Sequence, residues 1–179
     1  IYVNQVGGQD ELVFDGGSFA IDAQGELSVS AQTFIEAFPI VTVDRSSDAR
    51  LAPGDTVAER KDLDAVWQAL VLGMRDYVDK NGFPGVVLGL SGGIDSAVTL
   101  AVAVDALSHE RVEAVMMPFR YTASMSVEDA EAEAQALGVR FSNLSIEPLY
   151  EAFMTTLADE FSGLPANITE ENLQARCRG

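Results

Sequence analysis

The sequence has little cysteine, few basic residues and no long apolar run. Among its 179 residues there is one cysteine, Cys177, so no disulfide can form within the chain and we expect a cytoplasmic protein. The 28 acidic residues outnumber the 11 basic ones and give a net charge of −17, which argues against nucleic acid and anionic membranes as partners. No apolar run reaches the roughly 18 residues needed to span a bilayer.

Histidine is also scarce. The only histidine, His109, lies near an expected helix end, where a capping or surface role is favoured over a catalytic one. No arrangement of histidine and aspartate accompanies Cys177, so we interpret this cysteine as structural and not as a nucleophile. The composition therefore leaves the catalytic side chains of any reaction unidentified.

Hydrophobic patterning divides the chain into a β-rich part and an α/β part. Residues 1–44 alternate between apolar and polar positions and are interrupted by glycine pairs, which predicts short strands joined by turns. We expect strands over 2–4, 12–21, 27–30 and 38–44, with turns at 7–8 and 22–26. Residues 45–61 are polar, contain proline and glycine, and are interpreted as a linker.

From residue 62 onward the pattern alternates between helix and strand. Helical spacing predicts a helix from Asp62 that ends at Asn81-Gly82. Strands are expected over 86–90, 112–117 and 139–146, and helices over 97–104, 126–138 and 148–161. This order is typical of βαβ units with a parallel sheet, so we predict a Rossmann-like α/β domain over 62–179. Its ligands would bind at the carboxyl ends of the strands.

The segment Leu90–Ser96 connects one of these strands to an apolar helix. The first N–H groups of a helix lack internal partners and carry partial positive charge, so the segment is suited to bind a phosphate. Gly92 and Gly93 allow close approach of the backbone, and the carboxylate of Asp95 is a candidate Mg²⁺ ligand. No Gly-Lys-Ser/Thr follows, so this is not a Walker A loop. A purely structural glycine-rich turn remains the alternative.

The run Ser91-Gly92-Gly93-Ile94-Asp95-Ser96 resembles the loop of ATP pyrophosphatases, which cleave ATP between its α and β phosphates. Three further stretches resemble the glutamine-dependent NAD synthetases within that group: Asn4–Ser18, Met117–Ser124 and Glu171–Arg178. The resemblance implies an adenine nucleotide alpha-hydrolase-like domain at 62–179. Residues 1–44 would be the last part of a nitrilase-type glutaminase, itself an α/β sandwich.

The same resemblance implies a reaction. The carboxylate of nicotinic acid adenine dinucleotide would attack ATP to give an acyl-adenylate, and ammonia from glutamine would then displace AMP to give NAD. ATP and Mg²⁺ would be required, and a homo-oligomer is expected. The Cys-Glu-Lys triad of the glutaminase does not lie in this chain, which therefore resembles an incomplete piece of a two-domain enzyme.

The resemblance also assigns residues to ligands. ATP and its pyrophosphate would be bound by Leu90, Ser91, Gly92, Gly93, Ile94, Asp95, Ser96 and Arg120, with Asp95 on Mg²⁺. Arg176 and Arg178 would bind the dinucleotide substrate. A surface ion pair is the alternative for Arg120, and an exposed helix arginine is the alternative for Arg178. Phe119 replaces an expected small residue and would narrow the pocket.

Two other functions remain open from the residues alone. One is a different amidotransferase with the same loop, of the GMP-synthetase kind. The other is an adenine-nucleotide-binding module without catalysis. Asp95 distinguishes the second from an adenylating enzyme, because a module that only binds nucleotide needs no Mg²⁺-assisted release of pyrophosphate.

Overall fold

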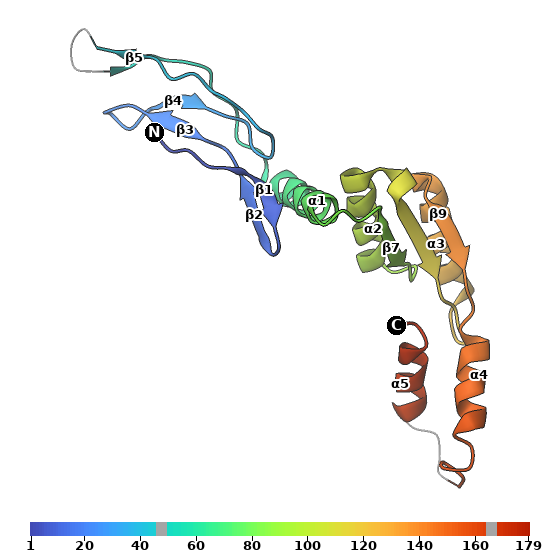
Figure 1. Cartoon of the computed structure of the whole chain (residues 1–179). Coiled ribbons are helices and arrows are strands. Elements are labelled where there is room, and N and C mark those ends of the chain that lie inside the picture. Colours follow the sequence, from blue (N-terminus) through green and yellow to red (C-terminus); the bar gives the residue numbers. More distant parts are fainter. Residues whose placement is uncertain (46–49, 164–167) are drawn as a thin grey trace. The chain divides into compact units, whose positions relative to one another are not determined.

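The computed structural model describes residues 1–45, 50–163 and 168–179. Its internal contacts divide the chain into two compact units, Ile1–Pro84 and Gly85–Gly179 (Figure 1). Within the described residues, no helix combines the length and the apolar character that a membrane span requires.

The first unit contains short antiparallel strand pairs. Strands β1 (Val6–Gln9) and β2 (Leu12–Asp15) form one hairpin, and β3 (Phe19–Ile21) and β4 (Leu27–Ser30) form another. The predicted turn at 22–26 is confirmed: the Asp22 carboxylate accepts the backbone N–H groups of Gln24 and Glu26 at 2.8 and 2.9 Å. Such Asx contacts are what makes aspartate favourable at the start of a turn.

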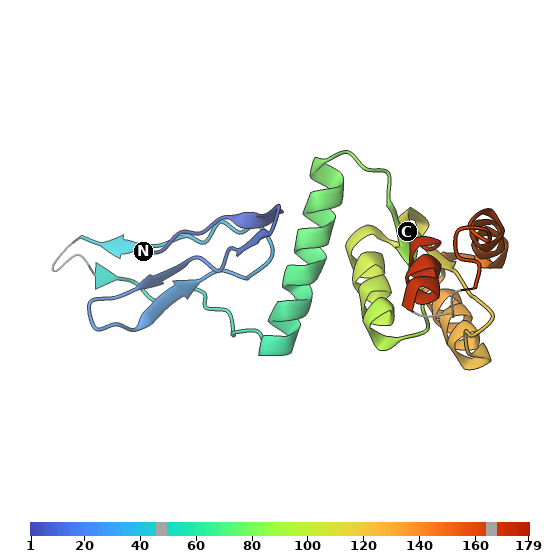
Figure 2. The same cartoon turned by 90° about the horizontal axis from the view of Figure 1, so that it is seen from below.

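Helix α1 (Asp62–Lys80) completes the first unit and packs against the β1–β2 hairpin, as Figure 2 shows. It buries Val71, Leu72 and Val78. The predicted stop is confirmed, because Asn81 caps the helix and Gly82 follows in the left-handed region with φ +69°.

Three expectations for the first unit are wrong. Gly7 and Gly8 form part of β1 and not a turn, because their bare backbone fits against α1. The strand expected at 2–4 is reduced to a bridge between Tyr2 and Phe19. The strand expected at 38–44 is reduced to β5 (Val43–Asp44), which pairs with β6 (Arg50–Leu51).

The segment expected to be a linker is partly ordered along the hairpins. It contains β6, and further on the N–H of Gly54 donates to Ser28 O at 2.9 Å while the N–H of Ser30 donates to Asp55 O at 3.0 Å. Residues 46–49 of this segment lie outside the described part. The domain boundaries at 44 and 61 stay a prediction; the contacts group α1 with the β-rich part.

The second unit is the predicted α/β arrangement. Its sheet is parallel in the order β7-β8-β9, with β7 at Val86–Gly89, β8 at Val112–Met116 and β9 at Arg140–Asn143. The connecting and following helices are α2 (Ile94–Leu107), the short 3₁₀ helix η1 (His109–Arg111), α3 (Ser124–Leu137), α4 (Glu147–Thr156) and α5 (Ile168–Arg176). Leu100 and Ala114 are fully buried between sheet and helices.

Three boundaries in this unit differ from expectation. Helix α2 begins at Ile94, so Asp95 lies in its first turn. Helix α3 begins at Ser124, two residues before the expected start, and ends at Leu137. Helix α4 ends at Thr156 and is followed by turns.

Candidate functional site

The loop Leu90–Gly93 leaves the carboxyl end of β7 and enters α2. The parallel ladder extends one residue beyond the strand, because the N–H of Leu90 donates to Val115 O at 2.9 Å. Gly92 then adopts φ +76°, and Gly93 returns to φ −95° as the residue before the helix. The chain can turn this sharply only where a residue without a side chain occupies the left-handed region.

Two serine hydroxyls give the loop its shape. Ser96 Oγ donates to Gly93 O at 2.9 Å and accepts the N–H of Ser91 at 3.2 Å. Ser91 Oγ lies 3.0 Å from Ser96 Oγ and accepts the N–H of Gly93 at 3.2 Å. Since a hydroxyl has one proton, Ser91 is left to donate to Ser96. Both hydroxyl protons are therefore used within the loop.

The donors that face outward from this loop come from the backbone. Helix geometry leaves the N–H groups of Ile94, Asp95 and Ser96 without intrahelical partners, and these lie where the helix dipole is positive. The Asp95 side chain is exposed beside them. In the described residues no three His, Cys, Asp or Glu side chains gather as a metal site, so Asp95 contributes a single carboxylate.

The loop is fixed against the start of α3. A Cβ on Gly92 would collide with the Ser126 carbonyl and would lie 2.7 Å from Ser126 Cα. The loop after β7 and the helix after β8 are thus in backbone contact at the carboxyl end of the sheet. This convergence of loops at one edge was predicted from the parallel order of the strands.

A cavity of about 260 Å³ lies at this edge of the sheet. Its walls are formed by Gly89, Leu90, Ser91, Met116, Met117, Thr122 and Arg178. Arg178 reaches it from beyond α5, where its Nε donates to Met117 O at 3.2 Å. Ligand pockets measure about 300–1,000 Å³, so the cavity accommodates part of a nucleotide and not the whole.

The residues expected at the site are only partly brought together. Leu90, Ser91 and Arg178 line the cavity, whereas Arg176 is exposed at the end of α5 and is not among the lining residues. Met116 and Thr122 were not singled out from the sequence. The available signal was their place at the carboxyl end of β8, because Met116 is its last residue and Thr122 lies in the loop that follows.

Arg120 is held by two glutamates of α4. Its guanidinium forms ion pairs with Glu147 and Glu151, which are one helical turn apart. The hydrogen bonds that Arg120 donates to Glu151 and, to a lesser extent, to Glu147 raise the pKa of Arg120. The contact observed for Arg120 is therefore the ion pair given above as its alternative role. Its contact with ATP stays a prediction.

Phe119 does not line the cavity, contrary to the expectation that it narrows the pocket. It is only 6% exposed and its ring packs 4.8 Å from that of Tyr150 on α4. The Arg120 guanidinium lies 5.1 Å from the Phe119 ring, within cation–π range. Phe119 and Arg120 together attach the loop after β8 to α4.

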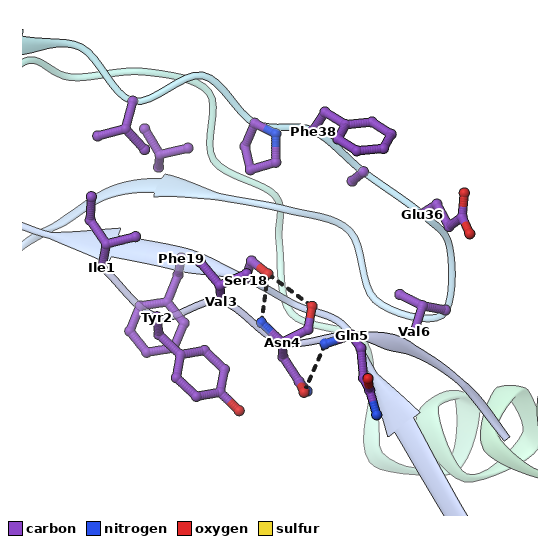
Figure 3. Close-up of a pocket in the computed structure, with 14 residues that line it drawn as sticks. Ile1, Tyr2, Val3, Asn4, Gln5, Val6, Ser18, Phe19, Glu36 and Phe38 are labelled. Carbon is purple, nitrogen blue, oxygen red and sulfur yellow. Dashed lines mark hydrogen bonds between the residues drawn. The ribbon is translucent and has the colours of Figure 1, made fainter. Parts of the chain in front are cut away.

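A larger cavity, of about 520 Å³, lies in the first unit (Figure 3). Its walls are mainly apolar and include the stacked rings of Tyr2 and Phe19 and the 91% exposed Phe38. The hydroxyl of Ser18 pairs with the backbone of Asn4: it accepts the Asn4 N–H at 3.0 Å and donates to the Asn4 carbonyl oxygen. With Glu36 as its one acidic lining residue, this cavity lacks convergent reactive groups.

Comparison with known proteins gives a family match for the second unit together with most of α1. Residues 66–179 match the family model described as NAD synthase. A curated relative from Acinetobacter baylyi, a glutamine-dependent NAD(+) synthetase, is 48% identical over the whole chain, and the chain spans 33% of its length. This chain thus covers about a third of the length of the curated relatives it matches.

Solved structures give the same match. A glutamine-dependent NAD+ synthetase from Acinetobacter baumannii, in complex with ADP, covers 99% of this chain with 49% identity and a TM-score of 0.94; the match takes in 34% of that protein. An NH3-dependent NAD synthetase from Campylobacter jejuni, in complex with nitrate, covers 66% of this chain and 49% of its own, with 28% identity and a TM-score of 0.58.

Gly92→Ala should destabilise the fold by at least about 2 kcal/mol, because a Cβ at positive φ is strained and this one also meets the Ser126 backbone. The matched control is Gly93→Ala, whose Cβ would meet only Ser91 Oγ at 3.3 Å and should cost less than about 1 kcal/mol. Thermal or urea unfolding measures both. Equal losses would show that Gly92 is not held against α3.

Proposed function

The chain belongs to the NAD synthase family, and we propose that it supplies the ATP-binding part of a glutamine-dependent NAD synthetase. The observation that carries the proposal is the Leu90–Ser96 loop, a phosphate-binding turn at the carboxyl end of a parallel strand within the matched residues. The relatives that match the whole chain carry that enzyme name. ATP is the nucleotide that the family and the ADP-bound relative favour.

In the proposed reaction a carboxylate oxygen of nicotinic acid adenine dinucleotide attacks the α-phosphorus of ATP. The bond between the α-phosphorus and the oxygen that bridges it to the β-phosphorus breaks, and pyrophosphate leaves with that oxygen. Ammonia then forms a C–N bond at the acyl carbon, AMP leaves with the oxygen that joined it, and one proton is released. Negative charge grows on the departing pyrophosphate, so its stabilisation is the main task of the binding loop.

The backbone of the loop performs that task. The N–H groups of Ile94, Asp95 and Ser96 point from the start of α2, and donors fixed in advance need no reorganisation when the charge develops. The hydroxyls of Ser91 and Ser96 hold the loop in this conformation through their mutual bonds. Their contribution to pyrophosphate binding is therefore indirect.

A Mg²⁺ ion fits the donor set at this position. Mg²⁺ is usually held by one or two carboxylates together with phosphate oxygens, and the exposed Asp95 carboxylate lies next to the phosphate donors. When bound, the ion neutralises charge on the pyrophosphate. Asp95 is the ligand that this chain would contribute.

The dinucleotide substrate is assigned to Arg176, the last residue of α5, and to Arg178, which follows it. Arg178 lies in the cavity wall beside Ser91, so a phosphate or carboxylate of the substrate would reach it next to the bound ATP. The resemblance gives Arg176 the same role and assigns Arg120 to ATP. Neither residue lines the cavity. Binding of glutamine, and assembly into an oligomer, belong to the whole enzyme.

The deciding experiment is an assay of NAD formation by the intact protein with ATP, Mg²⁺ and nicotinic acid adenine dinucleotide, with glutamine or ammonium as the nitrogen source. NAD from both sources is expected. NAD from ammonium alone would remove the glutaminase part of the proposal. Tight ATP binding without NAD or pyrophosphate would indicate a nucleotide-binding module instead, and amidation of another adenylated substrate would indicate a different amidotransferase.

Asp95→Asn should lower kcat for NAD synthesis by about 10²-fold or more, because charge stabilisation at the departing group is lost. Asp105→Asn, which makes the same change at the other end of α2, is the control and should leave kcat unchanged. Steady-state kinetics over a range of Mg²⁺ concentrations measure both. A wild-type rate and an unchanged Mg²⁺ dependence in Asp95→Asn would contradict the metal assignment.

Arg178→Ala should lower kcat/KM for the dinucleotide by about tenfold or more, the usual consequence of losing a charged hydrogen bond. KM for ATP should change less. Arg176→Ala, two residues away and outside the cavity wall, is the comparison and should have the smaller effect. If Arg176→Ala has the larger effect, the substrate binds at Arg176 and the cavity beside Ser91 is not its site.

A further inference from the structure

Helix α1 belongs to both parts of the chain. By sequence most of it lies in the family-matched region, which begins at residue 66. By contact it belongs to the unit Ile1–Pro84 and packs against β1 and β2. The contact between α1 and the hairpin therefore links the β-rich part to residues of the matched region.

Two side chains of α1 bind the backbone of β1 at one residue. Asp76 Oδ2 accepts the N–H of Gly8 at 2.8 Å, and Lys80 Nζ donates to the carbonyl oxygen of Gly8 at 2.7 Å. Asp76 and Lys80 also form an ion pair at 3.0 Å, one helical turn apart. The three groups close a ring of charged hydrogen bonds, which we call the Gly8 clamp.

Glycines on both sides of the contact leave little room for a side chain. A Cβ on Gly8 would lie 3.0 Å from Gly73 Cα, and a Cβ on Gly73 would lie 3.2 Å from Val13 Cγ2. Gly7, at φ +146°, would place a Cβ 3.1 Å from Asp76 Oδ2. The hairpin thus lies directly on the helix backbone, and the polar edge of β1 is satisfied by α1 in place of a further strand.

The clamp is partly shielded from water. The Asp76 side chain is 19% exposed, and that of Lys80 is 53% exposed. Burial alone would raise the pKa of Asp76, but the hydrogen bond from Gly8 and the charge of Lys80 outweigh it, so its pKa is lowered. The carboxylate is therefore charged throughout the neutral range, and the clamp stays closed there.

The relatives differ over the part that the clamp holds. The glutamine-dependent structure covers 99% of this chain, whereas the NH3-dependent one covers 66%, which is close to the share taken by residues 66–179. The β-rich part thus accompanies the use of glutamine in these relatives. The clamp joins that part to the helix with which the shared region begins.

We propose that Asp76 and Lys80 are positioning residues that hold the β-rich part on α1, so that ammonia released from glutamine reaches the amidation site. The inference rests on the proposed function. Neither residue contacts a reacting group. Their loss should impair synthesis from glutamine and spare synthesis from ammonium, which reaches the site from solution.

The test uses the intact enzyme carrying Asp76→Asn or Lys80→Met. Each substitution keeps the size of the side chain and removes its charge. The rate of NAD formation is measured with saturating glutamine and with ammonium, and the glutamate released is compared with the NAD formed. Asp64→Asn is the matched control, because Asp64 is also on α1 and its 2.7 Å ion pair is with Arg60 and not with β1.

We expect both clamp variants to keep the ammonium-dependent kcat and to lose about tenfold in the glutamine-dependent rate, since misplacement at a distance has effects of this size. Glutamate released per NAD formed should rise, and Asp64→Asn should behave as wild type. Parallel loss with both nitrogen sources, together with a lower Tm, would show that the clamp serves stability alone. Unchanged rates and an unchanged ratio would show that it serves neither.

A failure of the proposed function is distinguishable. It would appear in the wild-type enzyme, as no NAD from either source or from ammonium only, and would overturn the inference with it. A failure of the clamp appears only in the variants, against a wild type that uses both sources.

Discussion

Backbone contact at glycine is the constraint on which both units depend. In the second unit Gly92 lies against Ser126, which brings the loop after β7 onto the start of α3 and closes one side of the site. In the first unit Gly8 lies against Gly73, which brings a hairpin onto α1. At Gly92 a side chain would overlap the Ser126 backbone, and at Gly8 it would require a shift of a few tenths of an ångström between β1 and α1, because interiors are packed as densely as crystals. Glycine's larger entropy loss on folding is the cost of this closeness.

The proposed phosphate-binding loop lies in a strongly acidic chain. The net charge of −17 creates an unfavourable field for ATP, but at physiological salt that field is screened over about 8–10 Å. The N–H donors at the start of α2 act at contact distance, and the bonds between Ser91 and Ser96 keep them oriented. In the proposed binding mode, local geometry therefore outweighs the overall charge, which bears on partners that would approach a broad surface.

Much of the second unit could be predicted from the sequence, because its pattern is local. The alternation of apolar strands and helices predicts the parallel sheet, and Leu90–Ser96 predicts the turn from β7 into α2. The failures concern residues whose partners are distant in sequence. Gly7-Gly8 resembles a turn locally but is fixed in β1 by Asp76 and Lys80, about seventy positions away. Phe119 and Arg120 follow a strand, and this position predicts that they lie at the pocket. Their side chains instead contact α4, where Phe119 packs on a tyrosine ring and Arg120 pairs with two carboxylates.

The environment of Arg120 determines what it can do at the site. Its single positive charge faces two carboxylates, Glu147 and Glu151, so the cluster is already negative before a nucleotide arrives. Both glutamates contact Nη2 of Arg120, so a phosphate that approached its other N–H groups would meet a cluster whose net charge is negative. Arg178 lies in the cavity wall, and its hydrogen bonds go to the uncharged oxygens of Met117 and Gln174. An arginine bound to neutral acceptors keeps its charge for an anion, which makes Arg178 the better placed of the two to attract one.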